Sequence, residues 1–291
     1  MATGWSTTGS VADSLPDYRQ SARIVREFEG VMSQLSDVQK LGEGEGINWN
    51  EVSWAQLAAQ SVTELTDLEQ NPQQLSDSLL TIEPTIVGIY TLITDRVKQR
   101  ISKTAFGAMG GLRQNAIQRK KDEDGITVLD SATTSLCGTG TTLTSGYITA
   151  ATSRIRGNVT EPGPDPLRAV LHPYQIKDIA DELLAGVGTY VVDEGPTASV
   201  FRTGFKLPID GCEVYPDGNI PIVSNEAKGG VFSKMGIVLV QGRSPRMEIK
   251  REPGKGGGSE GVYHYDEYAY GERSTGNWVY EIYSDSTVPS S

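Results

Sequence analysis

Apolar residues recur at helical spacing through the middle of the chain. The stripe consists of Ile93, Val97, Ile101, Ala105, Ala108, Leu112 and Ala116. Steps of three or four residues place these side chains on one face of a helix. We therefore predict a helix over residues 95–132, with Ile101 and Leu112 facing a sheet of the same chain. Gly107, Gly110 and Gly111 lie inside it. Because glycine costs about 1 kcal/mol in a helix interior, the pattern also allows a break there.

Along the rest of the chain, segments with helical spacing of apolar residues alternate with strand-like segments, which predicts an α+β fold. Further helices are expected at residues 14–35, 144–156 and 174–185, and strands at 47–54, 81–92, 169–171, 235–240 and 246–251. The last two strands, at residues 261–270 and 277–284, are predicted to form a terminal β pair around the turn at 271–276.

An acidic segment separates two of these strands. Between Lys40 and Arg96 there is no lysine or arginine. The same stretch contains nine acidic residues: Glu43, Glu45, Glu51, Glu64, Asp67, Glu69, Asp77, Glu83 and Asp95. Such a segment cannot form a large core by itself, so it is either a flexible flap or a segment that lies on another molecule.

Composition narrows the class of protein. The chain has 291 residues, 37% of them hydrophobic, and a net charge of −11, which argues against a general nucleic-acid-binding surface. The first 14 residues do not have the pattern of a signal peptide, and no apolar run reaches the roughly 20 residues of a membrane helix. Two distant cysteines and two histidines make a zinc site unexpected and favour free thiols in a reducing compartment.

The residues that could carry chemistry do not form a recognisable constellation. The glycine-rich stretch at 253–259 lacks the helix that a phosphate-binding loop requires. Cys137 could pair with His172 or His264, but no flanking motif supports a nucleophilic site. Asp266 and Glu267 point to opposite faces if they lie on a strand. We predict no catalytic, cofactor-binding or metal-binding residues. A structural or interaction protein is favoured, with a soluble hydrolase using Cys137 or Asp266 as an alternative.

The order of the elements, together with several short stretches, resembles the major capsid proteins of tailed phages with the Hong Kong 97 phage capsid fold. The resemblance covers nearly the whole chain from Asp17 and rests on the order of the stretches. They are residues 21–27 (SARIVRE), 73–77 (QQLSD), 93–96 (ITDR), 118–122 (QRKKD), 170–173 (VLHP), 230–232 (GVF) and 268–271 (YAYG).

The resemblance implies a role for each part of the chain. Residues 1–40 would form the N-arm and 41–83 the extended E-loop. Residues 84–143 and 245–275 would form the peripheral domain, whose spine helix spans 101–129. Residues 144–244 and 276–291 would form the axial domain, which meets its copies around the capsomer axis.

The implied function is self-assembly into hexamers and pentamers that form the icosahedral head shell around packaged double-stranded DNA. The location would be the virion, after assembly in the host cytoplasm. Implied partners are further copies of the chain, a portal, a separate scaffolding protein and a decoration protein; the DNA would be enclosed without sequence-specific contact, and no membrane is involved. An encapsulin-type compartment shell is the alternative on the same fold. Some family members link subunits through an E-loop lysine, but residues 41–83 contain none.

The charge pattern predicts how the E-loop would contact a neighbouring subunit. The loop residues expected at that contact are Glu64, Asp67, Glu69, Asn71 and Gln73. The candidate basic partners are Arg96, Arg100, Lys103, Arg113, Arg119, Lys120 and Lys121. Several weak exposed pairs, each contributing about 0–1 kcal/mol, would be repeated around every capsomer.

Overall fold

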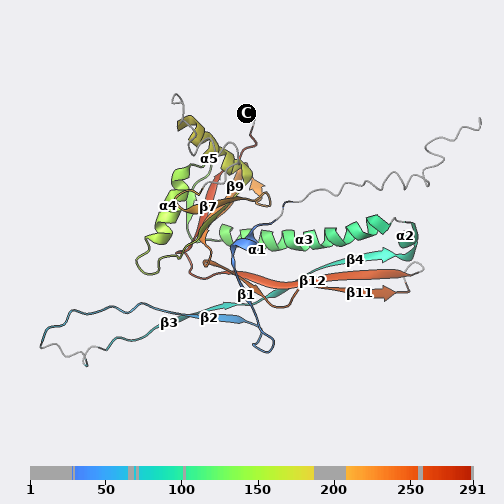
Figure 1. Cartoon of the computed structure of the whole chain (residues 1–291), viewed down its shortest axis with the longest axis horizontal. Helices are drawn as coiled ribbons and strands as arrows, with labels where there is room; N and C mark the ends of the chain where they lie inside the picture. Colours follow the sequence, from blue (N-terminus) through green and yellow to red (C-terminus); the bar gives the residue numbers. More distant parts are fainter. Residues whose placement is uncertain are drawn as a thin grey trace, which may run out of the picture.

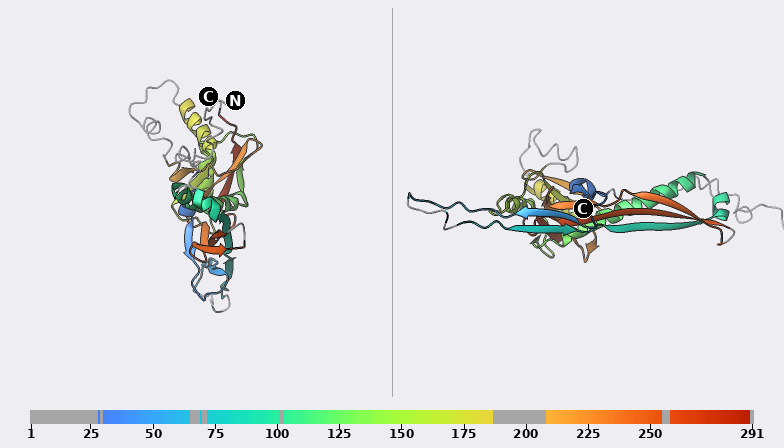
Figure 2. Two further views of the ribbon diagram at one scale, coloured as in Figure 1. Left: turned by 90° about the vertical axis from the view of Figure 1, so that its right-hand side faces the viewer. Right: turned by 90° about the horizontal axis from the view of Figure 1, so that it is seen from below.

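Two β-sheets, a long helix and a projecting hairpin make up an elongated molecule (Figures 1 and 2). The computed structural model describes residues 28, 30–64, 69, 72–100, 103–186, 208–254 and 258–289, without the side chains of 97, 98, 100, 103–109 and 183–186. No helix within these ranges is both long and apolar enough to cross a membrane.

The first sheet is organised around its longest strand, β12 (Ser259–Glu272). One side of β12 pairs antiparallel with β4 (Thr85–Thr94). The other side pairs antiparallel with β10 (Ile237–Gln241) and β11 (Arg246–Glu252), and β1 (Asp37–Lys40) adds to β10 in parallel. Because side chains alternate along a strand, Asp266 and Tyr268 face the long helix, whereas Tyr263 and Tyr265 face away from it.

The long helix, α3 (Lys103–Asp130), lies along one face of this sheet, and the short helix α2 (Asp95–Arg100) precedes it (Figure 1). The helix predicted over residues 95–132 is thus helical at 95–100 and at 103–130, while residues 101 and 102 lie outside the described part. The break that the glycines at residues 107–111 allow does not occur, because α3 runs unbroken through them.

The predicted inward face of α3 is displaced from the observed one. Leu112 is 42% exposed, so its predicted burial against the sheet is wrong, and Ile101 cannot be compared. The buried positions instead include Arg113, Ile117, Lys121 and Leu129. Two of these are basic residues that find partners on the sheet, and an apolar pattern cannot identify them.

The second sheet has six strands and carries two helices, α4 (Ser145–Arg156) and α5 (Pro173–Gly186). Its strands, in order, are β5 (Ser135–Cys137), β13 (Val279–Asp285), β9 (Glu226–Ser233), β6 (Leu167–Leu171) and β7 (Cys212–Pro216), with β8 (Ile222–Val223) added to β9. Ile148 and Ile155 of α4 and Ile179 of α5 pack with Val231 and Ile282 of the sheet, and all five are fully buried. Both helices lie where the sequence predicts them.

The predicted terminal β pair is wrong. Both strands form, as β12 and β13, but β12 lies in the first sheet and β13 in the second. The turn between them therefore crosses from one sheet to the other, and Trp278 fixes this crossing by donating its indole N–H to the Glu161 carbonyl oxygen at 2.9 Å. The strand pattern identifies a buried strand, but its partner depends on which long-range pairing buries more surface.

The hairpin and the segment before it complete the chain. β2 (Trp49–Trp54) and β3 (Asp77–Ile82) pair antiparallel and project from the body at the end opposite α2 (Figure 2). Of the helix predicted at 14–35, only α1 (Met32–Leu35) is helical among the described residues. Residues 28, 30 and 31 are not helical, and residues 14–27 and 29 lie outside the described part.

Candidate functional site

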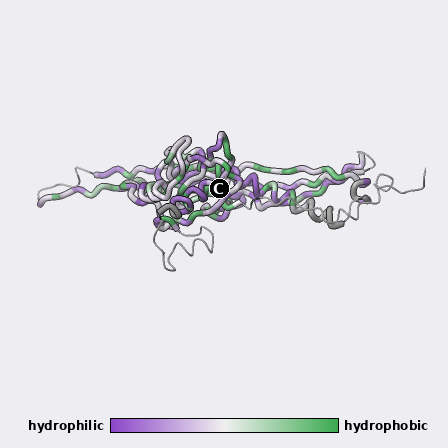
Figure 3. Tube along the Cα trace, turned by 90° about the horizontal axis from the view of Figure 1, so that it is seen from above, coloured by the Kyte–Doolittle hydropathy of each residue, from purple (hydrophilic) through white to green (hydrophobic). Residues whose placement is uncertain are grey.

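The hairpin exposes apolar surface that the subunit itself does not cover. β2 and β3 form a two-stranded sheet, and no third strand of the described residues joins it. Seven large apolar residues between positions 47 and 79 are at least 48% exposed: Ile47, Val52, Trp54, Leu57, Val62, Leu75 and Leu79. Hydrophobic stretches are visible along the projecting arms (Figure 3). An exposed apolar surface of this kind is typical of a site that another molecule covers.

The predicted loop contacts are only partly within the described structure. Glu64, Glu69 and Gln73 are exposed on the hairpin, whereas Asp67 and Asn71 lie outside the described residues. The Gln73 side chain joins the two arms by accepting from the Ala58 N–H at 2.9 Å and donating to the Ala58 carbonyl oxygen. Gln73 therefore holds the hairpin together within the subunit.

Two of the predicted basic partners are buried within their own subunit. Arg113 is 7% exposed and donates to Thr91 Oγ1 at 2.7 Å, while Lys121 is 6% exposed and pairs with Asp266 at 3.2 Å.

Arg113 and Lys121 are therefore both bonded to partners within their own subunit. Arg119 and Lys120 form i,i+4 pairs with Glu123 and Asp124, at 3.7 and 2.6 Å. Arg96 is exposed, and the side chains of Arg100 and Lys103 lie outside the described part.

An arginine that the sequence reading missed fixes the base of the hairpin. Arg273 donates from Nε to Glu51 of β2 and from Nη2 to Asp37 of β1, both at 2.8 Å, and from Nη1 to the Met235 carbonyl oxygen at 2.7 Å. Its side chain is only 12% exposed. Burial alone would raise the pKa of Asp37, but the hydrogen bond and charge of Arg273 hold that pKa below its ordinary value. One guanidinium thus links the hairpin to the first sheet.

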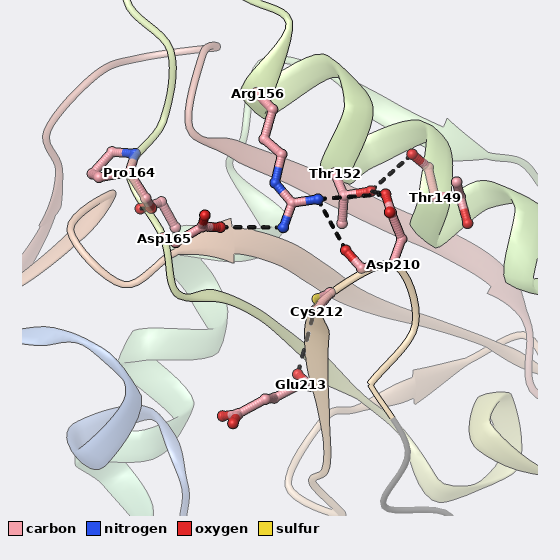
Figure 4. Close-up of polar contacts among 9 residues, drawn as sticks. Thr149, Thr152, Arg156, Pro164, Asp165, Asp210, Cys212 and Glu213 are labelled. Atoms are coloured by element: carbon pink, nitrogen blue, oxygen red, sulfur yellow. Dashed lines mark hydrogen bonds and ion pairs between the residues drawn. The ribbon is translucent and has the colours of Figure 1, made fainter. Parts of the chain in front are cut away.

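A second arginine organises the helix-facing edge of the second sheet (Figure 4). Arg156, in the last turn of α4, donates to Asp165 Oδ1 at 3.2 Å and to the Asp210 carbonyl oxygen at 3.0 Å. The Asp210 carboxylate also accepts from Thr152 Oγ1 at 2.6 Å. The Arg156 side chain is 38% exposed, so each pair contributes modestly. Together they position the turn that leads into β7.

The face of β4 turned away from α3 offers a second uncovered apolar surface. Ile86, Tyr90 and Leu92 alternate on this face and are 71%, 44% and 40% exposed. Tyr90 stacks on Tyr263 of β12, with ring centroids 4.6 Å apart. This flat, aromatic-supported strip is of the kind found at protein–protein contacts.

The cysteine, aspartate and histidine side chains considered for catalysis are buried or hydrogen-bonded within the fold. Burial raises the pKa of the Cys137 thiol, and raises that of Cys212 to about 12, so neither is prepared as a thiolate. Asp266 is held by Lys121, and His172 Nδ1 accepts from the Tyr174 N–H at 3.2 Å. Within the described residues, no group of three or more His, Cys, Asp or Glu side chains could hold a metal ion.

Several solved phage capsid structures have the same fold as this chain. No protein-family model matches the chain, and no curated protein sequence matches it. The chain is similar to the cyanophage Pam1 capsid (TM-score 0.71, 12% identity, 99% of this chain and 100% of that one). It is also similar to the head of Helicobacter pylori bacteriophage KHP40 (TM-score 0.70, 14% identity, 91% and 94%) and to Mycobacterium phage Che8 (TM-score 0.66, 15% identity, 90% and 94%).

Proposed function

We propose that this chain, which has the fold of phage capsid proteins, is the major capsid protein of a tailed bacteriophage. Copies of it assemble in the host cytoplasm into hexamers and pentamers, which close an icosahedral head around double-stranded DNA and remain in the virion. The observation that carries this proposal is the projecting hairpin, whose large apolar side chains are exposed in the single subunit. Its cover is then supplied by a neighbouring copy.

The two sheets support a division into the four parts expected for such a subunit. Residues 1–40 serve as the N-arm and 41–83 as the E-loop. The first sheet with α3 serves as the peripheral domain, and the second sheet with α4 and α5 as the axial domain. β10 belongs to the first sheet and β5 to the second, so in this proposal β10 is assigned to the peripheral domain and β5 to the axial domain.

The hairpin contacts a neighbour mainly through apolar surface in this proposal. Trp54 and Leu79 are 66% and 63% exposed on the hairpin, and the uncovered face of β4 with Ile86 offers a complementary strip. Burying apolar area contributes about 25 cal/mol per Å² before the costs of association are subtracted. Exposed ion pairs contribute about 0–1 kcal/mol each. Apolar burial is therefore the larger contribution.

Charge remains a secondary part of the proposal. Glu64, Asp67 and Glu69 of one copy would approach Arg96 and the Arg119–Lys120 pair of another. Arg113 and Lys121 take no part, because both are buried in their own subunit. A portal, a separate scaffolding protein and a decoration protein are the further partners we propose. The chain's net charge of −11 fits DNA that is enclosed without sequence-specific contact.

The test of the function is electron microscopy of the purified chain in negative stain. Closed shells, or rings of five and six subunits, support the proposal, whereas a monomer at high concentration contradicts it. Shells that enclose a protein cargo instead of DNA when isolated from the host would favour an encapsulin-type compartment.

Trp54→Ala tests the interface itself. Because Trp54 is mostly exposed in the subunit, we expect a change in unfolding free energy within about 0.5 kcal/mol but a large loss of assembly. The matched control is Val223→Ala, at a side chain that is 68% exposed on β8 of the second sheet, outside the hairpin. Equal assembly by both variants would exclude the hairpin as the contact.

Salt dependence distinguishes apolar from charge-driven docking of the hairpin, and a denaturing gel tests for covalent links between subunits. Apolar docking should persist at about 1 M salt, where the Debye length is about 3 Å, whereas charge-driven docking should weaken. Assembly that fails in salt and is insensitive to Trp54→Ala would favour the charge pattern. Because residues 41–83 contain no lysine, we also expect shells to separate into single subunits on a denaturing gel.

A further inference from the structure

Two buried carboxyl groups meet where residues 30–32 pass over the long helix. Asp122 of α3 is 2% exposed and Asp217, in the turn after β7, is 1% exposed. Asn219 connects them, because its backbone N–H donates to Asp217 Oδ1 at 2.9 Å and its side-chain N–H donates to Asp122 Oδ2 at 2.8 Å. The two acids are therefore neighbours in space although they are far apart in the sequence.

Asp122 is also the anchor for the segment that precedes α1. Its Oδ1 accepts from the backbone N–H of Met32 at 3.0 Å, and the Met32 side chain is fully buried. A Cβ at Gly30 would lie 2.5 Å from Asp122 Cβ, so the backbone passes directly over this carboxylate. Only glycine permits so close an approach. The Asp122 carboxylate thus holds residues 30–32 on the helix.

One oxygen of this cluster has no well-aligned donor among the described residues. Asp217 Oδ2 is buried, and no described residue donates a hydrogen bond of ordinary geometry to it, although the Val31 amide is close enough to Asp217 to oppose the rise of its pKa. A buried carboxylate oxygen without a donor is costly, and a second carboxylate beside it adds repulsion. A proton on Asp217 would remove both costs, because the protonated carboxyl group donates a hydrogen bond to the Asp122 carboxylate.

We propose that Asp217 and Asp122 share one proton, and that this carboxyl–carboxylate hydrogen bond is a latch that holds residues 30–32 on the long helix and opens as the pH rises. Such a bond between an acid and its conjugate base is strong, because its acceptor is ionised. The latch couples three elements: the segment before α1, the long helix, and the turn after β7. A cation between the two carboxyl groups is the competing arrangement, but these two side chains alone offer it few ligands.

The pKa of Asp217 supports the shared proton and tells in which direction the stability of the latch changes with pH. Burial, and then the hydrogen bond with Asp122, raise the pKa of Asp217 to about 7, against weaker opposing hydrogen bonds from the amides of Asn219 and Val31. A carboxyl group whose pKa is raised by folding stabilises the folded state fully below its ordinary value of 3.8. That contribution is lost progressively as the pH rises to about 7.

The other titratable groups around the pair do not reproduce this behaviour. On β12, burial and the charge of Asp122 raise the pKa of Tyr270, so its hydroxyl stays protonated throughout. At the end of β6, burial lowers the pKa of His172, which makes stability rise with pH. On α3, Lys121 is engaged by Asp266 of the sheet. A fall in latch stability with rising pH therefore reports on Asp217 and Asp122.

The test is hydrogen exchange of residues 30–36 in the full chain, corrected for the intrinsic exchange rate, from about pH 5 to about pH 8. In the unaltered chain the opening equilibrium should increase about tenfold per pH unit up to about pH 7 and then level off. Asp217→Asn supplies a permanent N–H donor to Asp122, so its opening should not depend on pH. The control Asp165→Asn, at a side chain 69% exposed, should behave like the unaltered chain.

A pH slope in Asp217→Asn equal to that of the unaltered chain would overturn the proposal, as would the absence of a slope in the unaltered chain. Protection that responds to a chelator instead of pH would favour a bound cation and also overturn it. If Asp217→Asn does not fold, infrared titration of the unaltered chain decides the question. A protonated carboxyl band that persists to about pH 6 supports the shared proton, and its absence refutes it.

Discussion

Replacing Arg273 should loosen the hairpin from the body more than replacing an exposed arginine would. Its guanidinium makes three hydrogen bonds, two of them to the carboxylates of Glu51 and Asp37. Charge-assisted bonds contribute about 1.5–3 kcal/mol each, but the three share one side chain, and the Glu51 side chain is 34% exposed. We therefore expect Arg273→Met to lower the free energy of unfolding by about 2–4 kcal/mol.

The assay combines urea unfolding with hydrogen exchange of β2 and β3. Arg273→Met should lower both the unfolding free energy and the protection of the hairpin strands. Arg273→Lys keeps the charge but lacks the planar fork that reaches three acceptors, so about half of the loss should remain. Arg251→Met is the matched control, because the Arg251 side chain pairs with Asp95 while 62% exposed and should cost about 0–1 kcal/mol.

Acid provides an independent check on this contact. Arg273 holds the pKa of Asp37 below its ordinary value of 3.8, so the contribution of this pair is present above that pH and is lost as the pH falls below it. The reasoning is refuted if Arg273→Met costs no more than Arg251→Met, or if hairpin protection is the same in both.

Three further predictions test the packing of the subunit. Leu129→Ala, at a fully buried side chain, should cost about 2–5 kcal/mol in urea unfolding, whereas Leu112→Ala, at a side chain 42% exposed, should cost far less; equal losses would contradict the observed helix face. Gly229→Ala would place a Cβ 2.4 Å from a backbone oxygen of β6 and should lower the melting temperature, whereas Gly110→Ala, with open space around it, should raise it slightly. Cys212, with its pKa raised to about 12, should resist alkylation at neutral pH until the chain unfolds, as read by mass spectrometry.

The sequence by itself determined most of the local structure. Apolar stripes at helical spacing located α3 and α4, the His172–Pro173 turn located the start of α5, and strand-like stretches located β2, β11 and β12, because such local patterns reflect the geometry of a single element. The absence of any basic residue between Lys40 and Arg96 left two interpretations of the hairpin segment, a flexible flap or a segment that lies on another molecule. The order of the elements resembled a capsid fold, and the solved structures share that fold.

Only the tertiary structure decided which elements pair and which polar groups are buried. β12 and β13 are both correctly located strands, yet they join different sheets, since pairing depends on surface buried between residues far apart in the chain. The inward face of α3 contains Arg113 and Lys121, whose charges are tolerated because Thr91 and Asp266 lie opposite them. A sequence pattern records the polarity of a side chain but not its partner. The Arg273 contacts and the carboxyl pair, which depend on such partners, therefore appear only in the folded chain.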